Sequence, residues 1–367
     1  MKKIIIIISI ILGLVALSFG IYFAWKKSQE ILTPPPPPEI KPSNPASDQP
    51  SLAPKPKMRV ISDGEIFDYW LTYSTSSPRI FYVNGDGKIF EAEEEADKLI
   101  TEVSANDFQS VESSTDGKYI LIKSGSLTKP QWSIFDTAEY VWQTIDGAVA
   151  AAFSPDSKKL VYLKENGDLI VKDIFSSQAT KIISFNQKDF SLRWLSEKGI
   201  ILTSKPSAYY FSEAWELNPE TKTLKKISEG WGLMTRWSND GKLGVQFATN
   251  PQRNDSLNLI DSQGAVVARF TFSSMPDKCF ITQPIIYCGV SQSNNYAGTI
   301  TLPDDYLKRA VHFNDFIYRL DTEKNSMEPI FAEYEPSLDI THLTAFGNQL
   351  FFINRYNNKL YSLEFSQ

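Results

Sequence analysis

The chain has 367 residues, a net charge of −6 and 13% aromatic residues, enough apolar material for a sizeable core. The acidic balance excludes nucleic acid as an expected partner, because basic patches with interleaved aromatics are absent. Two histidines and two cysteines cannot provide the common structural zinc spacings, so neither a metal site nor a cofactor is expected.

The first 27 residues have the composition of a membrane anchor. An uncharged run from Ile4 to Trp25 follows two lysines, and its 22 residues correspond to about 33 Å of helix, enough to cross a hydrocarbon core. The alternative is a cleaved signal peptide, whose apolar region is normally shorter and ends at a small-residue cleavage site. We predict a single-pass transmembrane helix with a cytoplasmic N-terminus and an extracytoplasmic remainder.

Prolines dominate residues 28–57, which are predicted to form a stalk. Five consecutive prolines at 34–38 are followed by five more between 42 and 56. Because proline lacks an amide donor and has a fixed φ, the stretch from Thr33 to Lys57 is expected to form neither helix nor sheet. An extended spacer of about 3 Å per residue is predicted, and a docking site for a proline-reading domain is the alternative.

From residue 58 to 367, a phrase of strand, tight turn and strand recurs at intervals of about forty residues. The aspartates of three copies, Asp116, Asp156 and Asp240, are separated by 40 and 84 residues, and 84 is two steps of 42. A period of this length in an all-β pattern indicates the blades of a β-propeller. Seven four-stranded blades are predicted, with six or eight as alternatives.

Two copies of the phrase carry a recognisable family pattern: residues 153–160 read FSPDSKKL and residues 237–242 read WSNDGK. They resemble the repeats of TolB-like β-propellers and, more loosely, WD repeats and the N-terminal propeller of dipeptidyl peptidase IV. The resemblance implies an all-β propeller over residues 58–367. It implies no catalytic residue, because the chain has neither an α/β-hydrolase domain nor the separate N-terminal domain of TolB.

The last predicted blade ends one strand short, with its final strand at residues 359–364. The segment from Met58 to Phe67 is strand-like and has no blade of its own. We therefore predict that it completes the last blade, closes the ring and hides two sheet edges.

The two cysteines flank a predicted tight turn at Gln283 and Pro284. A two-residue turn there sets Cys279 opposite Cys288, and opposed positions of an antiparallel pair approach disulfide distance. A disulfide is predicted, which fits an oxidising location outside the cytoplasm. The alternative is a pair of buried free thiols.

An insertion of about residues 291–314 separates that hairpin from the strand that begins at Phe316. Long loops in compact domains are often functional, so the insertion is our candidate binding surface; a lid over one end of the propeller is the alternative. Exposed Tyr209 and Tyr210 are expected to contribute to binding. The candidate binding residues of the insertion are Asn294, Tyr296, Asp304, Asp305, Tyr306, Arg309 and His312.

No catalytic motif is recognisable, and no catalytic residue is assigned. The inner strands read as apolar or small, as at residues 150–152, which disfavours chemistry in a central channel. The predicted function is a membrane-tethered, extracytoplasmic, non-catalytic scaffold that binds an envelope protein, peptide or glycan. The alternatives are a propeller hydrolase or lyase acting on a cell-wall or glycan substrate in the central channel, and an envelope assembly factor similar in role to TolB.

Overall fold

The computed structural model describes residues 13, 15, 17–27, 36–41, 56–72, 78–102, 107–126, 129–174, 176–292 and 300–365. The chain divides into two compact units, Met1–Pro38 and Glu39–Gln367. In the first unit, residues 17–27 are helical. Among the residues that the structure describes, no helix has the length and apolar character of a membrane span. The predicted span over residues 4–25 lies partly outside the described residues.

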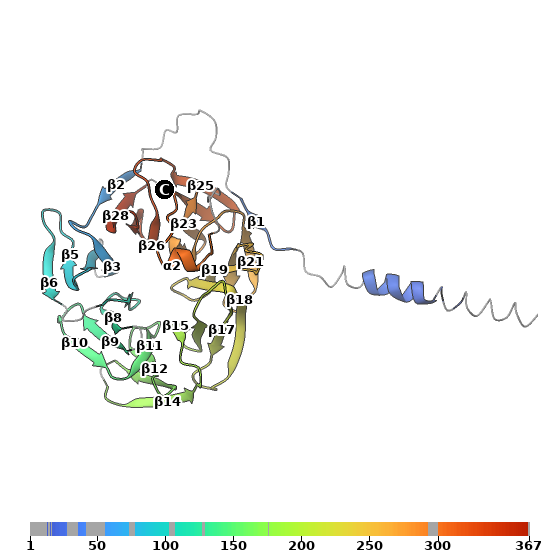
Figure 1. Ribbon diagram of the computed structural model, residues 1–367, viewed down its shortest axis with the longest axis horizontal. Coiled ribbons are helices and arrows are strands. Elements are labelled where there is room, and N and C mark those ends of the chain that lie inside the picture. The colour runs from blue at the N-terminus through green and yellow to red at the C-terminus, as the bar shows by residue number, and fades with distance from the viewer. Residues whose placement is uncertain are drawn as a thin grey trace, which may run out of the picture. The chain divides into compact units, whose positions relative to one another are not determined.

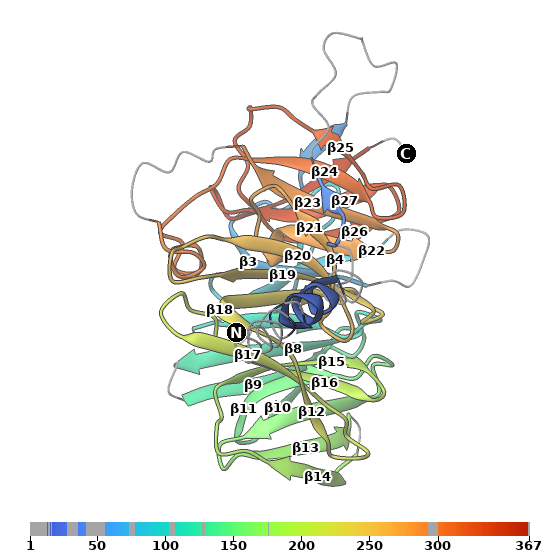
Figure 2. The same ribbon diagram turned by 90° about the vertical axis from the view of Figure 1, so that its right-hand side faces the viewer.

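The second unit is an all-β propeller, in which sheets are set around a central axis (Figure 1) and stand side by side when viewed from the edge (Figure 2). The described strands form five four-stranded sheets and one eight-stranded sheet. The first sheet contains β3 (Ile66–Thr72), β4 (Arg79–Asn84), β5 (Lys88–Glu91) and β6 (Lys98–Glu102). The second contains β7 (Ser110–Ser113), β8 (Tyr119–Ser126), β9 (Lys129–Asp136) and β10 (Trp142–Ile145). The third contains β11 (Ala148–Phe153), β12 (Lys159–Lys164), β13 (Asp168–Asp173) and β14 (Ala179–Ser184).

The eight-stranded sheet follows in the chain. It contains β15 (Phe190–Ser196), β16 (Gly199–Ser204), β17 (Phe211–Leu217), β18 (Leu224–Trp237), β19 (Leu243–Thr249), β20 (Ser256–Asp261), β21 (Val266–Phe270) and β1 (Glu39–Ile40). The first part of β18 pairs with β17, and its last part pairs with β19. The change of partner falls at Trp231, beside Gly232, whose φ of 63° is one that side-chain-bearing residues rarely adopt.

The two remaining sheets bring the ends of the propeller together. One contains β22 (Cys279–Thr282), β23 (Ile285–Ser291), β24 (Asp315–Asp321) and β25 (Ser326–Phe331), preceded by the 3₁₀ turn η1 (Pro276–Lys278). The other contains β26 (Ile340–Phe346), β27 (Gln349–Asn354), β28 (Lys359–Glu364) and β2 (Lys57–Val60). A short helix, α2 (Asp304–Leu307), lies in the connection between β23 and β24.

The strand from the N-terminal side completes the last sheet as predicted, because β2 pairs antiparallel with β28. The rest of the predicted closing segment behaves differently. Ile66 and Phe67 belong to β3, the first strand of the first sheet, and not to the last sheet. A cluster that includes Tyr69 and Leu71 from β3 and Phe351 and Leu360 from the last sheet joins the two sheets.

The stalk does contribute to a sheet, so the expectation that residues 33–57 form no sheet is wrong. Glu39 and Ile40 pair in parallel with Arg269 and Phe270 of β21. These two residues lie between Pro38 and Pro42 and keep the backbone groups that proline lacks. The Ile40 side chain is 1% exposed and packs in the same cluster as Phe270.

The repeated phrase forms a hydrogen-bonded turn between the first and second strands of a sheet. The Ser154 hydroxyl donates to Asp156 Oδ1 at 2.6 Å and accepts from the backbone N–H of Lys159 at 2.8 Å. The bond from Ser154 lowers the pKa of Asp156. The same pair of bonds recurs at Ser114, Asp116 and Tyr119 and at Ser238, Asp240 and Leu243. The forty-residue period of the sequence therefore arises because the same hydrogen-bonded turn recurs in successive sheets.

The same turns join neighbouring sheets. Gly241 has a φ of 68°, and a Cβ atom there would lie 2.8 Å from Cβ and 2.9 Å from the carbonyl oxygen of Leu195, near the end of β15. Ser157 adopts a φ of 57° at the equivalent place, and its hydroxyl accepts from the backbone N–H of Asp116 in the preceding turn at 3.3 Å. Each turn therefore holds its own sheet together and also contacts the sheet before it.

Candidate functional site

A cavity of about 530 Å³ runs along the axis of the propeller, and we call it the central channel. It is lined by residues of β3, β7, β11, β15, β18 and β26 and of η1. The expectation that this lining is apolar or small is wrong. Ala152 does line it, but so do six ionisable side chains: Asp68, Glu112, Arg193, Arg236, Asp277 and His342.

Strand alternation explains how charged residues reach the channel. In a strand, successive side chains point to opposite faces. Trp194 and Trp237 are 8% and 6% exposed and pack in hydrophobic clusters, although both also border the cavity, and the residue before each of them points to the opposite face of its strand. Those residues are Arg193 and Arg236, and both line the cavity. An arginine directly before a packed tryptophan of a repeat is therefore the sequence pattern that predicts these channel cations.

His342 is held in the channel by an irregularity of β26. The pairing of β26 with β27 shifts register between Thr341 and Thr344, and His342 has a φ of 53°. A β-bulge redirects a side chain, and a left-handed conformation at a residue other than glycine is uncommon. The Tyr69 hydroxyl stabilises this conformation from the first sheet, because it lies 2.7 Å from the carbonyl oxygen of His342.

Asp68 orients the imidazole of His342. The distance between His342 Nδ1 and Asp68 Oδ1 is 2.6 Å, and Asp68 Oδ1 also accepts from the backbone N–H of Tyr69 at 2.8 Å. The pKa of His342 is raised: enclosure by protein lowers it, but the charge of Asp68 and the bond to it raise it more. Within the described part of the chain, Nε2 of His342 has no hydrogen-bond partner. The pair is an oriented imidazole that faces the channel.

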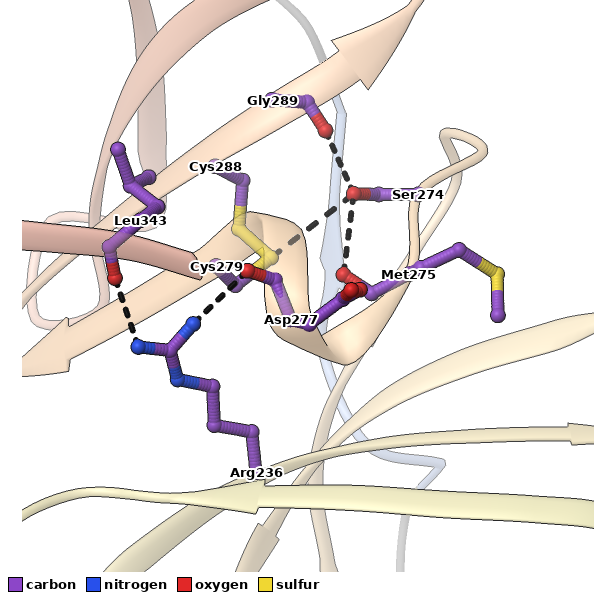
Figure 3. Close-up of a disulfide and its surroundings, with 8 residues drawn as sticks. All are labelled: Arg236, Ser274, Met275, Asp277, Cys279, Cys288, Gly289 and Leu343. Atoms are coloured by element: carbon purple, nitrogen blue, oxygen red, sulfur yellow. Dashed lines mark hydrogen bonds between the residues drawn. A yellow bond between two sulfur atoms is a disulfide. The ribbon is translucent and has the colours of Figure 1, made fainter. Parts of the chain in front are cut away.

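The two arginines lack carboxylate partners of their own. Arg236 donates from Nη1 to the backbone oxygen of Asp277 at 2.8 Å and from Nη2 to that of Leu343 at 2.7 Å (Figure 3). Burial and the charge of Arg193 both lower the pKa of Arg236, although nearby acidic groups oppose this. Burial raises the pKa of Glu112, and Arg193 only partly offsets that effect. Neither arginine forms an ion pair with any residue that the structure describes.

Asp277 connects the channel to the insertion. Its Oδ2 accepts from the Tyr306 hydroxyl at 2.7 Å and from the Thr341 hydroxyl at 2.8 Å. Its Oδ1 is buried and has no hydrogen-bond partner among the residues that the structure describes. Tyr306 is 3% exposed, so the expectation that this tyrosine is an exposed binding aromatic is wrong. It is instead part of the packing between the insertion and η1.

The next residue, Lys278, points into a second cluster of charges away from the channel. Its Nζ lies 2.5 Å from Asp315 Oδ2 and 2.6 Å from Asp339 Oδ1, and all three side chains are at most 1% exposed. Arg355 Nη1 lies 3.0 Å from Asp339 Oδ2. We call Lys278, Asp315, Asp339 and Arg355 the buried ion network. It joins the last two sheets and holds the insertion through a bond from Arg355 to the carbonyl oxygen of Tyr306, at 2.9 Å.

The described part of the insertion is fastened to the propeller. Asp304 accepts from the backbone N–H of Ala208 at 2.7 Å, and Asp305 accepts from that of Thr301 at 2.8 Å. Arg309 donates to Asn358 at 2.6 Å. The bonds of Asp304 and Arg309 link the insertion to the connections between β16 and β17 and between β27 and β28, and that of Asp305 lies within the insertion. Such anchoring suits the lid alternative, and a binding role stays a prediction.

Three predicted binding positions of the insertion remain. Asn294 and Tyr296 lie outside the described residues. His312 is 39% exposed, lies 3.1 Å from Asp339 Oδ2 through Nδ1, and stacks on Tyr356 with ring centroids 5.0 Å apart. Among the other expected aromatics, Tyr209 and Tyr210 are 65% and 51% exposed.

The cysteines face each other at the start of the hairpin that follows η1. Cys279 pairs with Cys288 in the strand register, and their sulfur atoms are bonded (Figure 3). Both residues are fully buried. The disulfide comes directly after Asp277 and Lys278, which face the channel and the buried ion network. Over the described ranges, no group of three or more His, Cys, Asp or Glu residues is arranged to hold a metal ion.

Comparison with known proteins supports the fold. No family model and no curated protein matches the chain. TolB from Acinetobacter baumannii matches 74% of this chain and 65% of its own at 15% identity, with a TM-score of 0.45. The tricorn protease matches 86% of this chain and 34% of its own at 10% identity, with a TM-score of 0.52. A putative TolB from Agrobacterium tumefaciens matches 53% of this chain and 77% of its own at 14% identity, with a TM-score of 0.39.

The chain therefore spans less than two thirds of the first two structures that it resembles. At such identities a structural likeness extends to the β-propeller architecture alone. The chemistry of the central channel has to be judged from its own residues.

Proposed function

We propose that this protein is a propeller of seven blades, tethered to a membrane and exposed outside the cytoplasm, that binds a partner molecule in its central channel without transforming it. Seven blades follow when the eight-stranded sheet is divided at β18 into two blades and added to the five four-stranded sheets. The apolar run at residues 4–25 supports the tether, and the buried disulfide supports an oxidising compartment.

The observation that carries the proposal is the ionisable lining of the channel. A purely structural channel has no need of three carboxylates, two guanidiniums and an imidazole, because taking such groups out of water costs free energy unless each is well paired. Cavities that bind ligands combine an apolar wall with a few well-placed polar groups, and their volume is about 300–1,000 Å³. The central channel has about 530 Å³, with tryptophan and phenylalanine beside the charged groups.

Site-specific photo-crosslinking in intact cells tests this function. The crosslinking amino acid replaces Ser113, which lines the channel, and, as a matched control, Glu220, which is exposed in the turn between β17 and β18. We expect a defined adduct with an envelope protein, peptide or glycan from position 113 only. No adduct from position 113, or the same adducts from both positions, would contradict a binding channel.

A second candidate is an enzyme that acts on a cell-wall or glycan substrate. The observation in its favour is His342, which is held at a φ of 53° and oriented by Asp68 with Nε2 toward the channel, as a general base requires. Incubation of purified cell-wall glycan with the full-length chain tests it by chromatography of the products. Products that the wild type forms and a His342→Gln variant does not would establish catalysis and displace the non-catalytic proposal.

A further inference from the structure

Two guanidinium groups enter the central channel from equivalent positions of successive repeats. Arg193 precedes Trp194 on β15, and Arg236 precedes Trp237 on the last part of β18. The two arginines lie close enough for the charge of Arg193 to lower the pKa of Arg236. Both line the same cavity, and because two neighbouring cations repel each other, an anion that contacts both is favoured there.

The orientation of Arg236 is set by neutral groups. Its Nη1 and Nη2 atoms bond the backbone oxygens of Asp277 and Leu343, as Figure 3 shows. These bonds use two of the five donors of a guanidinium, and both acceptors are neutral backbone oxygens and not carboxylates. Asp277 and Leu343 belong to η1 and β26, so two different sheets hold this side chain in place. The guanidinium group of Arg236 is therefore already oriented before a ligand binds.

The other arginine is more open. Arg193 is exposed to the channel, and among the residues that the structure describes it has neither a hydrogen bond nor an ion pair. An arginine side chain loses much conformational freedom when it is ordered, so a free one in a cavity is available to close on a ligand.

The carboxylates of the channel make their direct contacts with groups other than the two arginines. Asp68 bonds His342, and Oδ2 of Asp277 accepts from two hydroxyls. Glu112 remains: burial raises its pKa and the charge of Arg193 opposes this, but no direct ion pair joins the two among the described residues. The cationic pair thus has no dedicated anion in the described part of the chain.

We propose that Arg193 and Arg236 bind an anionic oxygen group, a carboxylate or a phosphate, of the ligand that occupies the central channel. This inference rests on the proposed function and specifies the chemical class of the ligand. Arginine matches both anions through paired N–H donors, which makes these contacts shorter and stronger than neutral hydrogen bonds. With about 530 Å³, the channel accommodates a small molecule or a peptide end, and not a folded domain.

Isothermal titration calorimetry on the full-length chain tests the proposal with three probes. The probes are trialanine with a free carboxylate, the same peptide with a C-terminal amide, and inorganic phosphate. We expect binding of the free peptide or of phosphate that weakens as salt is raised, and no measurable binding of the amide. Stronger binding of the peptide would identify a carboxylate ligand, and stronger binding of phosphate would identify a phosphate ligand.

Substitutions locate the binding. Arg193→Gln, which breaks no hydrogen bond or ion pair within the described residues, is expected to weaken anion binding at least tenfold, as is Arg236→Gln. Arg193→Lys should restore part of the loss because it keeps the charge. The matched control is Arg79→Gln, which removes a guanidinium from an exposed pair with Glu91 on β4 and β5 and should leave binding unchanged.

Three results would overturn the proposal: equal binding of the amide and the free acid, no binding of any anion, and unchanged binding by Arg193→Gln. The crosslinking experiment separates these failures from a failure of the proposed function. A position-113 adduct that persists in Arg193→Gln would keep the channel as a binding site and reject the anionic ligand. Absence of a position-113 adduct in the otherwise wild-type protein would reject both the binding channel and the anionic ligand.

Discussion

Truncation of Ile40 to alanine should release the stalk from the propeller without unfolding it. The docked segment β1 has only two residues, and its attachment depends on the Ile40 side chain and on the Ile40 carbonyl oxygen. That oxygen accepts from the backbone N–H of Thr271 at 3.2 Å and from the Thr271 hydroxyl at 3.1 Å. The side chain is 1% exposed.

The free energies that favour and oppose docking of β1 are of similar size. Burial of an isoleucine side chain contributes about 1.5–3 kcal/mol, and ordering the backbone costs about 1–2 kcal/mol for each residue. For two residues these terms nearly cancel, and the hydrogen bonds to Thr271 add about 1 kcal/mol each. Alanine removes three carbon atoms at about 0.8 kcal/mol each, which reduces the docked population relative to the undocked one by a factor of about 50.

Hydrogen exchange measures this directly through the Thr271 amide, which bonds Ile40. In Ile40→Ala we expect its protection to fall by more than tenfold, whereas the melting temperature of the propeller changes little. Val60→Ala is the control, because Val60 is an aliphatic residue of the outer strand β2 and is 50% exposed. Unchanged protection at Thr271 would refute the reasoning, and so would a loss of protection throughout the propeller.

Three further changes test the turns, the disulfide and the buried ion network. Gly241→Ala should destabilise the propeller by about 1–3 kcal/mol more than Gly347→Ala in chemical unfolding, because both have positive φ but only Gly241 has neighbours within 4 Å; equal effects would show that packing on Leu195 is unimportant. Replacement of both Cys279 and Cys288 by serine should lower the unfolding free energy by about 2–3 kcal/mol, and maleimide labelling of the wild type only after reduction would verify the bond; labelling before reduction would contradict it. Burial raises the pKa of Asp315 to about 6, so its contribution to stability is full below about pH 4 and is lost as the pH rises through 6. The unfolding free energy of the wild type relative to Asp315→Asn should therefore fall by up to about 3 kcal/mol between pH 4 and pH 7, and a constant difference would refute the pKa.

The architecture was largely predictable because its signals are local. The serine and aspartate of each phrase, such as Ser154 and Asp156, bond each other two residues apart, so the turn is specified within one short stretch. The tight turn between Cys279 and Cys288 likewise sets their register. Closure by β2 was predictable because the last blade lacked one strand, whereas the N-terminal side of the propeller had a strand-like segment without a blade of its own.

The channel was not predictable in the same way, because it is assembled from distant residues. Asp68 and His342 are 274 positions apart and meet only because the first and last sheets are neighbours. His342 also depends on a bulge that the strand pattern does not reveal. Arg193 and Arg236 were visible beside tryptophans, and the alternation of strand faces is the signal that could have placed them in the channel.

The docking of β1 escaped prediction for a different reason. Composition dominates a proline-rich stretch, and a two-residue strand produces no periodicity. Ile40 is nevertheless apolar, and it lies in a short non-proline segment, residues 39–41, that directly follows the run of five prolines. An isolated isoleucine in such a segment is a candidate for docking on a sheet edge, where backbone groups are unpaired.

The two clusters of charge around η1 differ in a way that separates structure from function. In the buried ion network, two cations face two carboxylates, all nearly inaccessible to solvent, so the charges balance within the protein. In the central channel, neither Arg193 nor Arg236 forms an ion pair with a carboxylate of the described residues. Removing one member of a balanced buried pair costs several kcal/mol, which suits a cluster that holds the last two sheets and the insertion together. Charged groups that lack direct ion pairs in an accessible cavity lower stability unless something binds them, and a ligand is a natural complement for them. The adjacent residues Asp277 and Lys278 belong to one cluster each, so η1 and the disulfide behind it support the propeller and its channel at the same point in the chain.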